Sequence, residues 1–539
     1  RGNSLCYRCG TTVTNDTVKA EGKAGRMGAQ MMATVCVRPG ARGKVYLSPD
    51  DLPLPVPDED AIRARIAALT AETGITPPDE PLPEKLTGGM CTIYGLTRFG
   101  DLFTPRQMLT LLTFVKHVRS AHDAMLAAGL DGEYAKALTT YLGIILSRFT
   151  NFYSSECVWY SDGGRGVRQV FIRQALPMTW DYAESNPYNP AASSWHASTR
   201  SVLDALSPID LSTTPGQVLR ASATNTPVAN THFDAVVTDP PYYDNVSYSD
   251  LSDYFYVWLS RAIGFLHSEH FSTELAPKKN EAISVKHRHG NNQQRAREFY
   301  ETMMQDAFSE AHRVLDPGGI MVTVYAHKTT AGWSTLIEAT RKAGFCITEA
   351  WPLETEQAHR ALSQDTAALA SSIFLVGRKR DNGHTARYVE EVQLEMKRIV
   401  KERVGFLLAY GIAGADLSIA TVGAALAPFT RYARVELPNG EELTAAAYLE
   451  EVQREVIQVL LGEAAKTDER TQYYLMARHN YGGAWVEFDE ANNLARTIGV
   501  ELDSGPDALT RGADALVEKK GSQVRLLGFE ERGDSESLG

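Results

Sequence analysis

Residues 235–260 read AVVTDPPYYDNVSYSDLSDYFYVWLS, and this stretch decides how the rest of the chain is interpreted. The apolar run at 233–237 predicts a buried strand that ends in Thr-Asp-Pro-Pro-Tyr. Proline has no backbone N–H to donate to a sheet, so Pro240 and Pro241 end the strand and restrict the backbone that follows. The pattern therefore brings one carboxylate, rigid carbonyls and an aromatic ring to a strand tip.

Downstream of this tip the sequence alternates between strand and helix patterns. Strands are predicted at 233–238, 320–325, 346–351 and 371–376, and helices at 251–263, 298–314 and 334–343. Strands that alternate with helices of this length predict an α/β fold with a doubly wound sheet. Ligands bind such sheets at the carboxyl ends of the strands, which is where residues 239–242 fall.

The composition is typical of a globular protein of several domains. A chain of 539 residues predicts two to four domains of roughly 100–200 residues each. The opening residues, RGNSLCYRCG, lack the apolar core of a signal peptide, and no apolar run approaches the roughly 18 residues of a membrane span. Six cysteines in so long a chain do not form a disulfide framework, so we expect a reducing, cytoplasmic location and no membrane partner.

Six segments differ in composition and periodicity. The first three are a glycine-rich, basic segment with a CxxC (1–50), a proline-rich linker around a short helix (51–90), and a helical and loop-rich region with two helices between 104 and 149 (91–232). The other three are the predicted half-sheet (233–380), a mostly helical region with a hairpin near 435–440 (385–518), and a polar tail that we expect to be disordered (519–539).

The strand tip suits one kind of chemistry. An exocyclic amine of a nucleobase carries two N–H groups, and accepting both hydrogens directs its lone pair toward an incoming methyl group. Asp239 can accept one hydrogen and the carbonyl of Pro240 the other, while the Tyr242 ring offers a stacking face. A base in a duplex reaches such a pocket only when it is flipped out of the helix. The alternative is an acidic turn after a buried strand, which many α/β proteins have.

Several segments together resemble a known family. The stretch around Asp239-Pro240-Pro241-Tyr242 resembles motif IV of amino-methyltransferases, and Asp in first place resembles the adenine-N6 kind. More narrowly, the chain is similar to the large zinc-ribbon-containing adenine-specific DNA methylases of prokaryotes, some of them associated with phage defence. The matching segments, in order, are CYRCG, YGLTRFGDLFTPRQML, FIRQALPMTWDYAESNP, the motif IV run, VTVYAHK and SSIFLVGRKR.

The resemblance implies an activity, a cofactor and partners. It implies a site-specific DNA methyltransferase that moves a methyl group from S-adenosylmethionine to adenine N6, on a class I S-adenosylmethionine-dependent methyltransferase-like (Rossmann-like) sheet. Asp239, Pro240, Pro241 and Tyr242 would then be the catalytic residues. The implied partners are DNA and the components of a restriction or defence system.

The chain departs from this family at one important place. It contains no Asp-x-Phe-x-Gly-x-Gly run, the loop with which such enzymes approach the cofactor, and the stretch at 415–424 is a poor substitute. The family places that loop upstream, and the chain opens on Arg1 rather than Met, so we expect an incomplete N-terminal half of the sheet and little cofactor binding. The alternatives are a non-catalytic DNA-binding or scaffold subunit, and an RNA or cytosine-N4 methyltransferase.

Two further segments are candidates for cofactor and metal binding. Phe103, Thr104 and Pro105 resemble the segment that covers the methionine end of the cofactor, although Thr104-Pro105 also fits a plain helix N-cap. Asp181 lies in an aromatic, acidic turn that would line the base pocket, hold the cofactor or simply pack. Cys6 and Cys9 form half of a zinc knuckle, and structural zinc needs four ligands, so we expect an incomplete zinc site. Cys36 lies in what reads as a buried strand.

One local segment reverses the net charge of −12. Residues 278–297 contain six Lys or Arg against one Glu, which fits a loop that contacts DNA phosphates or, alternatively, a solvated loop. The candidate DNA-binding residues are Lys278, Lys279, Lys286, Arg288, Arg295 and Arg297. Tyr325, His327 and Lys328 end the next strand and would border the site. The histidines and cysteines otherwise suggest no metal or nucleophile constellation.

Overall fold

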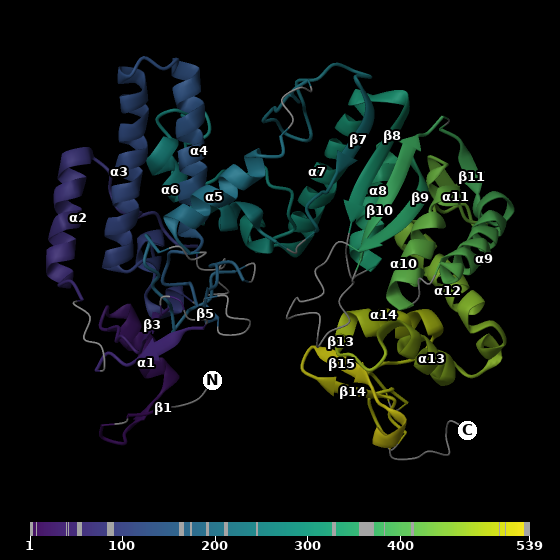
Figure 1. The fold of residues 1–539 in the computed structure, drawn as a ribbon. Coiled ribbons are helices and arrows are strands. Elements are labelled where there is room, and N and C mark those ends of the chain that lie inside the picture. The colour runs from purple at the N-terminus through teal and green to yellow at the C-terminus, as the bar shows by residue number, and fades with distance from the viewer. Residues whose placement is uncertain are drawn as a thin grey trace. The chain divides into compact units, whose positions relative to one another are not determined.

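The computed structural model divides into two compact units, each built from two stretches of sequence (Figure 1). Unit 1 comprises Arg1–Gln217 and Ser247–Glu281, and unit 2 comprises Val218–Val246 and Ala282–Gly539. The structure describes residues 4–6, 8–38, 40, 43–50, 56–83, 91–160, 166–172, 175–189, 193–209, 214–243, 246–325, 330–354, 371–381, 383–410, 414–505, 507–512 and 514–532. The boundary near residue 246 therefore separates the predicted strand tip from the helix that follows it.

Unit 1 is built around long helices. α3 (Pro105–Ala127) and α4 (Gly132–Thr150) confirm the two helices predicted between 104 and 149, and α6 (Tyr248–Ile263) packs against both. Thr104 and Asp131 begin α3 and α4 by accepting backbone N–H groups of the first turn. α2 (Glu59–Thr73) packs on α3.

Short elements complete unit 1. They are β1 (Ser4–Leu5), β2 (Thr12–Val13), α1 (Asn15–Lys23), β3 (Thr34–Cys36), β4 (Val45–Leu47), η1 (Thr92–Tyr94), η2 (Phe99–Leu102), β5 (Trp159–Tyr160), β6 (Gly166–Val167) and α5 (Trp195–Leu206). The strand predicted around Cys36 is present as β3, which pairs with β4 and is half-buried rather than buried.

Unit 2 contains a mixed four-stranded sheet. Its order is β7 (Phe233–Thr238), β8 (Leu315–Tyr325), β10 (Ser371–Lys379) and β9 (Phe345–Glu354). β7 and β8 are parallel, whereas β10 runs antiparallel to both of its neighbours. All four predicted strands are present, as are the helices α6, α7 (Gln293–Val314) and α8 (Thr330–Lys342), so the mixed α/β class is confirmed.

A bulge lies where β7 and β8 begin. Phe233 pairs with Leu315, yet two residues later Ala235 pairs with Ile320, so the Asp-Pro-Gly-Gly segment before Ile320 is accommodated as extra backbone. The prediction began this strand at Ile320, whereas the structure begins it at Leu315. Beyond the bulge Val237 pairs with Val322, which brings the carboxyl ends of the two parallel strands to the same edge.

The two faces of the sheet are covered unequally. Along β8, Met321, Thr323 and Tyr325 are buried, and the residues between them are only half-buried. The prediction that the strand at 233–238 is buried is wrong, because β7 contains no buried residue. Val237, which lies opposite Val322 on the less covered face, is 71% exposed. β7 is an edge strand, so this face continues to an unpaired edge within the described part of the chain.

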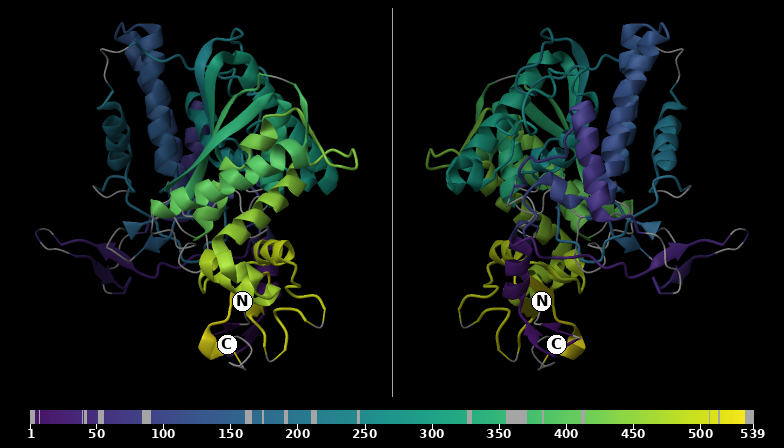
Figure 2. Two further views of the ribbon diagram at one scale, coloured as in Figure 1. Left: turned by 90° about the vertical axis from the view of Figure 1, so that its right-hand side faces the viewer. Right: turned by 90° about the vertical axis from the view of Figure 1, so that its left-hand side faces the viewer.

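Helices pack on the buried face, as Figures 1 and 2 show. The Trp333 ring of α8 contacts Tyr325 of β8 edge to face, with centroids 5.3 Å apart. α10 (Gly414–Ala424) approaches the sheet at Gly423. A side chain at this position would collide with Ala350 of β9. Crossover connections between parallel strands are right-handed, so successive strands placed on the same side of the previous one put their connecting helices on the same face of the sheet. This rule accounts for the helices covering one face.

The C-terminal part of unit 2 is mostly helical. Its first elements are β11 (Thr385–Arg387), η5 (Tyr388–Val392), α9 (Gln393–Ala409), α11 (Ala427–Thr430), β12 (Arg434–Glu436), α12 (Ala445–Leu461) and η6 (Gly462–Lys466). The turn of the predicted hairpin is present, because the Leu437 N–H donates to the Glu441 carbonyl. β12, however, pairs in parallel with β11.

A small α/β subdomain ends the described chain. Its elements are α13 (Glu469–Tyr481), β13 (Val486–Glu487), α14 (Phe488–Ile498), β14 (Val517–Lys520), β15 (Gln523–Leu526) and η7 (Phe529–Glu531). The prediction of a disordered tail over 519–539 is wrong for 519–532, because alternate residues of β15 enter a core of their own. Residues 533–539 lie outside the described part.

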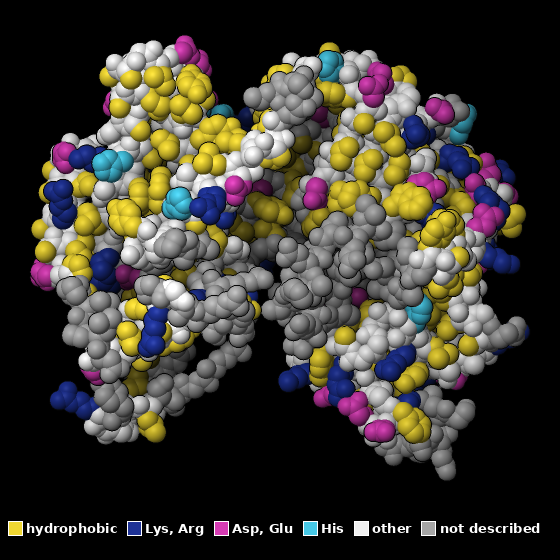
Figure 3. All heavy atoms as spheres, viewed as in Figure 1, with side chains coloured by type: hydrophobic (Ala, Val, Ile, Leu, Met, Phe, Trp, Pro, Cys, Tyr) yellow, Lys and Arg dark blue, Asp and Glu magenta, His cyan; other side chains and the backbone are white. Residues whose placement is uncertain are grey.

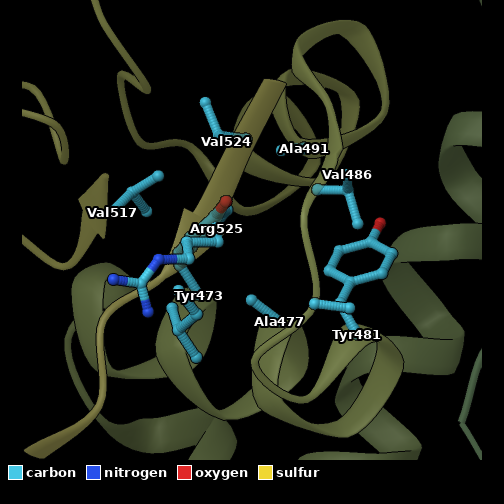
Figure 4. A pocket seen from close by; sticks show the side chains of 10 residues that line it. Tyr473, Ala477, Tyr481, Val486, Ala491, Val517, Val524 and Arg525 are labelled. Carbon is cyan, nitrogen blue, oxygen red and sulfur yellow. The ribbon is translucent and has the colours of Figure 1, made fainter. Parts of the chain in front are cut away.

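A small pocket in this subdomain is a packing gap. It lies between α13, α14 and the β13-β15-β14 sheet, and its lining is mostly apolar (Figure 4). Its charged member, Arg525, forms ion pairs with Glu518 and Glu531 at 2.6 and 2.8 Å. The pocket therefore presents no uncompensated charge to a ligand.

The packing of α10 on the sheet can be tested with two glycines. Gly423→Ala would place a methyl group against Ala350, so we expect the free energy of unfolding to fall by about 1–3 kcal/mol. Gly405→Ala, on the exposed side of α9, meets nothing within 4 Å and should raise it by about 0.5–1 kcal/mol. Urea denaturation followed by circular dichroism measures both changes, and changes of the same sign would contradict this packing.

Candidate functional site

The strand tip opens to solvent. β7 ends at Thr238, after which Asp239 is exposed, Pro240 is buried, and Pro241 and Tyr242 are half-buried. The carboxylate therefore stands outside the core, while the proline next to it anchors the backbone. All four predicted catalytic residues lie together at the carboxyl end of a strand in unit 2, where α/β sheets bind ligands.

Tyr300 of α7 holds the backbone of the tip. Its buried hydroxyl donates to the Pro241 carbonyl at 2.7 Å and accepts the Tyr243 N–H at 3.1 Å. The two rings also meet edge to face, with centroids 5.1 Å apart. Tyr243 has φ = 41°, a left-handed conformation that bulky residues rarely adopt. The Tyr300 contacts and a bond from the Ser284 N–H to the Tyr243 carbonyl hold it there.

Aromatic side chains fix Tyr242. Its hydroxyl donates to Oδ1 of Asp239 at 2.8 Å, and its ring meets Tyr325 edge to face, with centroids 5.4 Å apart. Tyr325 is fully buried and donates to the Gly332 carbonyl at 3.0 Å. A packed chain of rings thus positions the phenol beside the carboxylate.

Two acceptors remain open at the tip. Within the described part of the chain, neither Oδ2 of Asp239 nor the Pro240 carbonyl receives a hydrogen bond. By contrast, the next carbonyl, that of Pro241, is satisfied by Tyr300. Two adjacent residues therefore present an ionisable acceptor and a carbonyl acceptor to a ligand with two N–H groups.

Four of the basic candidates lie on the same part of unit 2. Lys286 and Arg288 are in η4 (Lys286–His289), and Arg295 and Arg297 are in the first two turns of α7, the helix that carries Tyr300. Lys286 and Arg295 are exposed and form no ion pair with the described residues, whereas Arg297 pairs with Glu301 at 2.7 Å. Figure 3 shows acidic and basic side chains interspersed over the viewed face, with no extended basic surface there. The excess of positive charge at 278–297 is therefore confined to this segment of the sequence.

The other two basic candidates belong to unit 1, and one has a different role. Lys278 Nζ lies 2.7 Å from Oδ2 of the buried Asp253. Burial raises the pKa of Asp253, and the Lys278 ammonium opposes that rise. We therefore withdraw Lys278 as a DNA contact, because it compensates a core carboxylate. Lys279 is exposed.

The residues predicted to bind the cofactor lie in unit 1 and are mostly used by the fold. Phe103 is 7% exposed and stacks on Tyr254, so its ring belongs to the core of unit 1. The Thr104 hydroxyl accepts the Gln107 N–H, and the Gln107 side chain accepts the Thr104 N–H, a complete capping box with Pro105 at the first position.

Asp181 is exposed and belongs to a segment that contacts the first turn of α3. Three residues after it, Glu184 forms a two-point ion pair with Arg106, with bonds of 2.6 and 2.9 Å. The two segments that the sequence associated with the cofactor are therefore neighbours in unit 1. The described contacts between them are those of a packed loop.

The cysteine half-site is a tight turn. The Gly10 N–H donates to the Cys6 carbonyl at 2.8 Å, between the paired strands β1 and β2. Hydrogen bonding with Thr11 lowers the pKa of the Cys9 thiol. Among the described residues, no third His, Cys or carboxylate joins this pair in a metal-sized group. His327 and Lys328 lie outside the described part.

The structure contains a histidine cluster that was not predicted from the sequence. His267, Glu269 and His270 place one ligand atom each within 4.8 Å of one another, a cluster that the sequence analysis did not identify. The signal was the spacing H-x-E-H directly after a helix that ends before a glycine.

Comparisons with known proteins give no assignment. A scan against protein-family models found no match, and neither did searches of curated proteins and of solved structures. Among the described helices, none offers an apolar stretch long enough to cross a bilayer.

Glu156 is a perturbed carboxyl in the core of unit 1. It is 3% exposed, and burial raises its pKa to about 7, against the effect of a 2.9 Å hydrogen bond from Thr179. The Cys91 thiol lies 3.9 Å from its other oxygen, and burial raises the pKa of Cys91 as well. Because Glu156 is enclosed, we interpret it as a pH-sensitive core group.

Glu156 predicts how stability depends on pH. The folded pKa lies above the unfolded value of about 4.3, so the folded state binds more protons between these values. The free energy of unfolding should therefore fall as the pH rises from about 5 to 8, by about 3 kcal/mol at most. Glu156→Gln should remove this fall in urea denaturation, and the exposed Asp204→Asn should leave it unchanged. An equal slope in wild type and Glu156→Gln would contradict the assignment.

Proposed function

We propose that unit 2 holds the target amine of a DNA methyltransferase that acts on adenine N6. The observation that carries this proposal is the pair of open acceptors, Oδ2 of Asp239 and the Pro240 carbonyl, at an exposed strand tip. An exocyclic amine with two N–H groups has the complementary donors. The resemblance to amino-methyltransferases around these residues supports the choice of reaction.

In this proposal the chain's own residues orient the amine. Asp239 and Pro240 accept its two hydrogens, which directs the nitrogen lone pair away from both acceptors. When bound, S-adenosylmethionine supplies an electrophilic methyl group. Tyr242 packs against the flipped base, and its hydroxyl already orients Asp239 through Oδ1. No dedicated base is required, because the nitrogen loses its proton after it has attacked.

The residues of this chain fit the amine better than the cofactor. Phe103 is in the core, the Thr104 and Gln107 groups satisfy each other, and the sequence has no glycine-rich cofactor loop. We therefore assign no cofactor step to these residues. Catalysis requires other residues to hold S-adenosylmethionine opposite the tip.

The form of the sheet supports the class I-like interpretation. In a doubly wound sheet the helices switch faces where the strand order reverses. The sheet of unit 2 extends from β7 in one direction only and is covered on one face. It has the arrangement expected of one half of such a sheet, with the proposed site at its open edge.

The basic segment supports DNA as the partner. Lys286 and Arg295 are exposed and uncompensated by described acidic groups, and Arg288 and Arg297 lie beside them in sequence. Phosphate contacts position a protein on DNA without reading its sequence. Because α7 carries Arg295, Arg297 and Tyr300, phosphate contacts of these two arginines would be rigidly connected to the tip.

A second candidate is a non-catalytic DNA-binding subunit. The burial of Phe103 and the missing glycine-rich loop favour it for this chain taken alone. Methylation of RNA or of cytosine N4 uses the same amine chemistry. Mass spectrometry of the modified nucleoside distinguishes these substrates from adenine in DNA.

The amine-holding role predicts the effect of one substitution. In the protein as encoded by its natural gene, Asp239→Ala should lower the rate of methyl transfer to DNA by about 100-fold or more, because an oriented acceptor is lost. Asp234→Ala is the matched control, since Asp234 is also exposed and lies on the same strand. The measurement is incorporation of labelled methyl groups into DNA. Normal activity of Asp239→Ala would refute the proposed role.

A further inference from the structure

A compact cluster of ligand atoms follows α6 in unit 1. Oε1 of Glu269 lies 3.9 Å from Nδ1 of His267 and 3.7 Å from Nε2 of His270. The two imidazole rings are nearly parallel, with centroids 6.0 Å apart and an angle of 16°. Two imidazole nitrogens therefore converge on one carboxylate oxygen.

A hydroxyl group determines which nitrogen of His267 carries the proton. Thr140 of α4 donates its single hydroxyl hydrogen to the Lys136 carbonyl at 2.8 Å. Its oxygen can then only accept in its 2.8 Å contact with Nε2 of His267. Nε2 is therefore protonated, and in the neutral ring Nδ1 presents its lone pair toward Glu269. A hydrogen bond on the far nitrogen is how metal-binding histidines are oriented.

The turn that carries these residues is well ordered by its own bonds. The N–H groups of His270 and Phe271 both donate to the His267 carbonyl. The Phe271 ring packs on Tyr256 of α6, with centroids 5.1 Å apart. The three side chains are thus held by a closed turn, so little ordering is needed before an ion binds.

We propose that His267, Glu269 and His270 bind one divalent transition-metal ion, with Zn²⁺ the best fit. Two imidazoles and one carboxylate are typical zinc ligands, and zinc distances of about 2.0–2.1 Å in a tetrahedron imply ligand atoms about 3.4 Å apart. The observed 3.7 and 3.9 Å need to shorten by only a few tenths of an ångström. Three protein ligands leave one position for water.

The surrounding charges are compatible with this ion. Glu269 and Glu133 favour positive charge at His267, and Lys136 and His270 oppose it. The ion would fix the turn after α6 and, through Thr140, connect it to α4. This site is independent of the proposed methyl transfer.

Zinc titration of the whole chain tests this site. The Cys6→Ser/Cys9→Ser chain should be used as the starting protein, so that thiols do not contribute. We expect calorimetry to show one Zn²⁺ bound per chain. His270→Ala and Glu269→Gln should each weaken Zn²⁺ binding by about 10–100-fold or more, because losing a direct ligand costs at least as much as losing a residue that hydrogen-bonds a ligand. Both side chains are partly exposed, at 42% and 59%, so the variants should fold. Circular dichroism checks this.

Two further variants distinguish ligation from non-specific binding. Thr140→Val should weaken Zn²⁺ binding about tenfold, because His267 loses the bond that orients it. The exposed His117→Ala on α3 should leave binding unchanged. The proposal would be overturned if the starting protein bound no Zn²⁺. It would also be overturned if His270→Ala and Glu269→Gln bound Zn²⁺ as tightly as the starting protein does.

Discussion

The hydroxyl of Tyr300 is the constraint on which the site depends. Two prolines end β7, and the chain must then turn sharply through a tyrosine at φ = 41°. One buried phenol satisfies the carbonyl before this turn and the N–H within it, so the strained backbone is fixed to α7. Tyr300 engages the carbonyl of Pro241, whereas the carbonyl of Pro240 and Oδ2 of Asp239 receive no hydrogen bond from the described residues. The site thus follows from which backbone groups are satisfied and which are left open.

The form of the sheet fits the proposal that the strand tip supplies one half of an active centre. Its helices cover one face, and its first strand is an edge strand with Val237 largely exposed. Parallel strands of α/β proteins are usually covered on both faces. The proposed amine site stands at that open edge, and the residues suggested for the cofactor are committed to capping and core packing in unit 1.

The elements of the fold could be predicted from the sequence, whereas several side-chain roles could not. Proline placement and the apolar run predict β7 with the bounds that the structure shows, and helical periodicity predicts the helices that follow. Sequence motifs suggest ligand roles for Phe103 and Lys278, because a motif shows neither the Tyr254 ring that stacks on Phe103 nor the Asp253 carboxylate that pairs with Lys278. The polar residues near 520 read as disordered because a short strand buries only alternate positions. Tyr300 gave no local signal, since its partners are about 60 residues away.

Hydrogen exchange at the Tyr243 amide tests the central claim most directly. In Tyr300→Phe the ring is kept while the acceptor of this N–H is removed. The account predicts that exchange at Tyr243 becomes about 10- to 100-fold faster, the equivalent of about 1–3 kcal/mol, while amides of β8 are unchanged. Tyr432→Phe, whose hydroxyl has no partner among the described residues, is the control. Unchanged exchange at Tyr243 would contradict the account, because the tip would then be held by something other than this phenol.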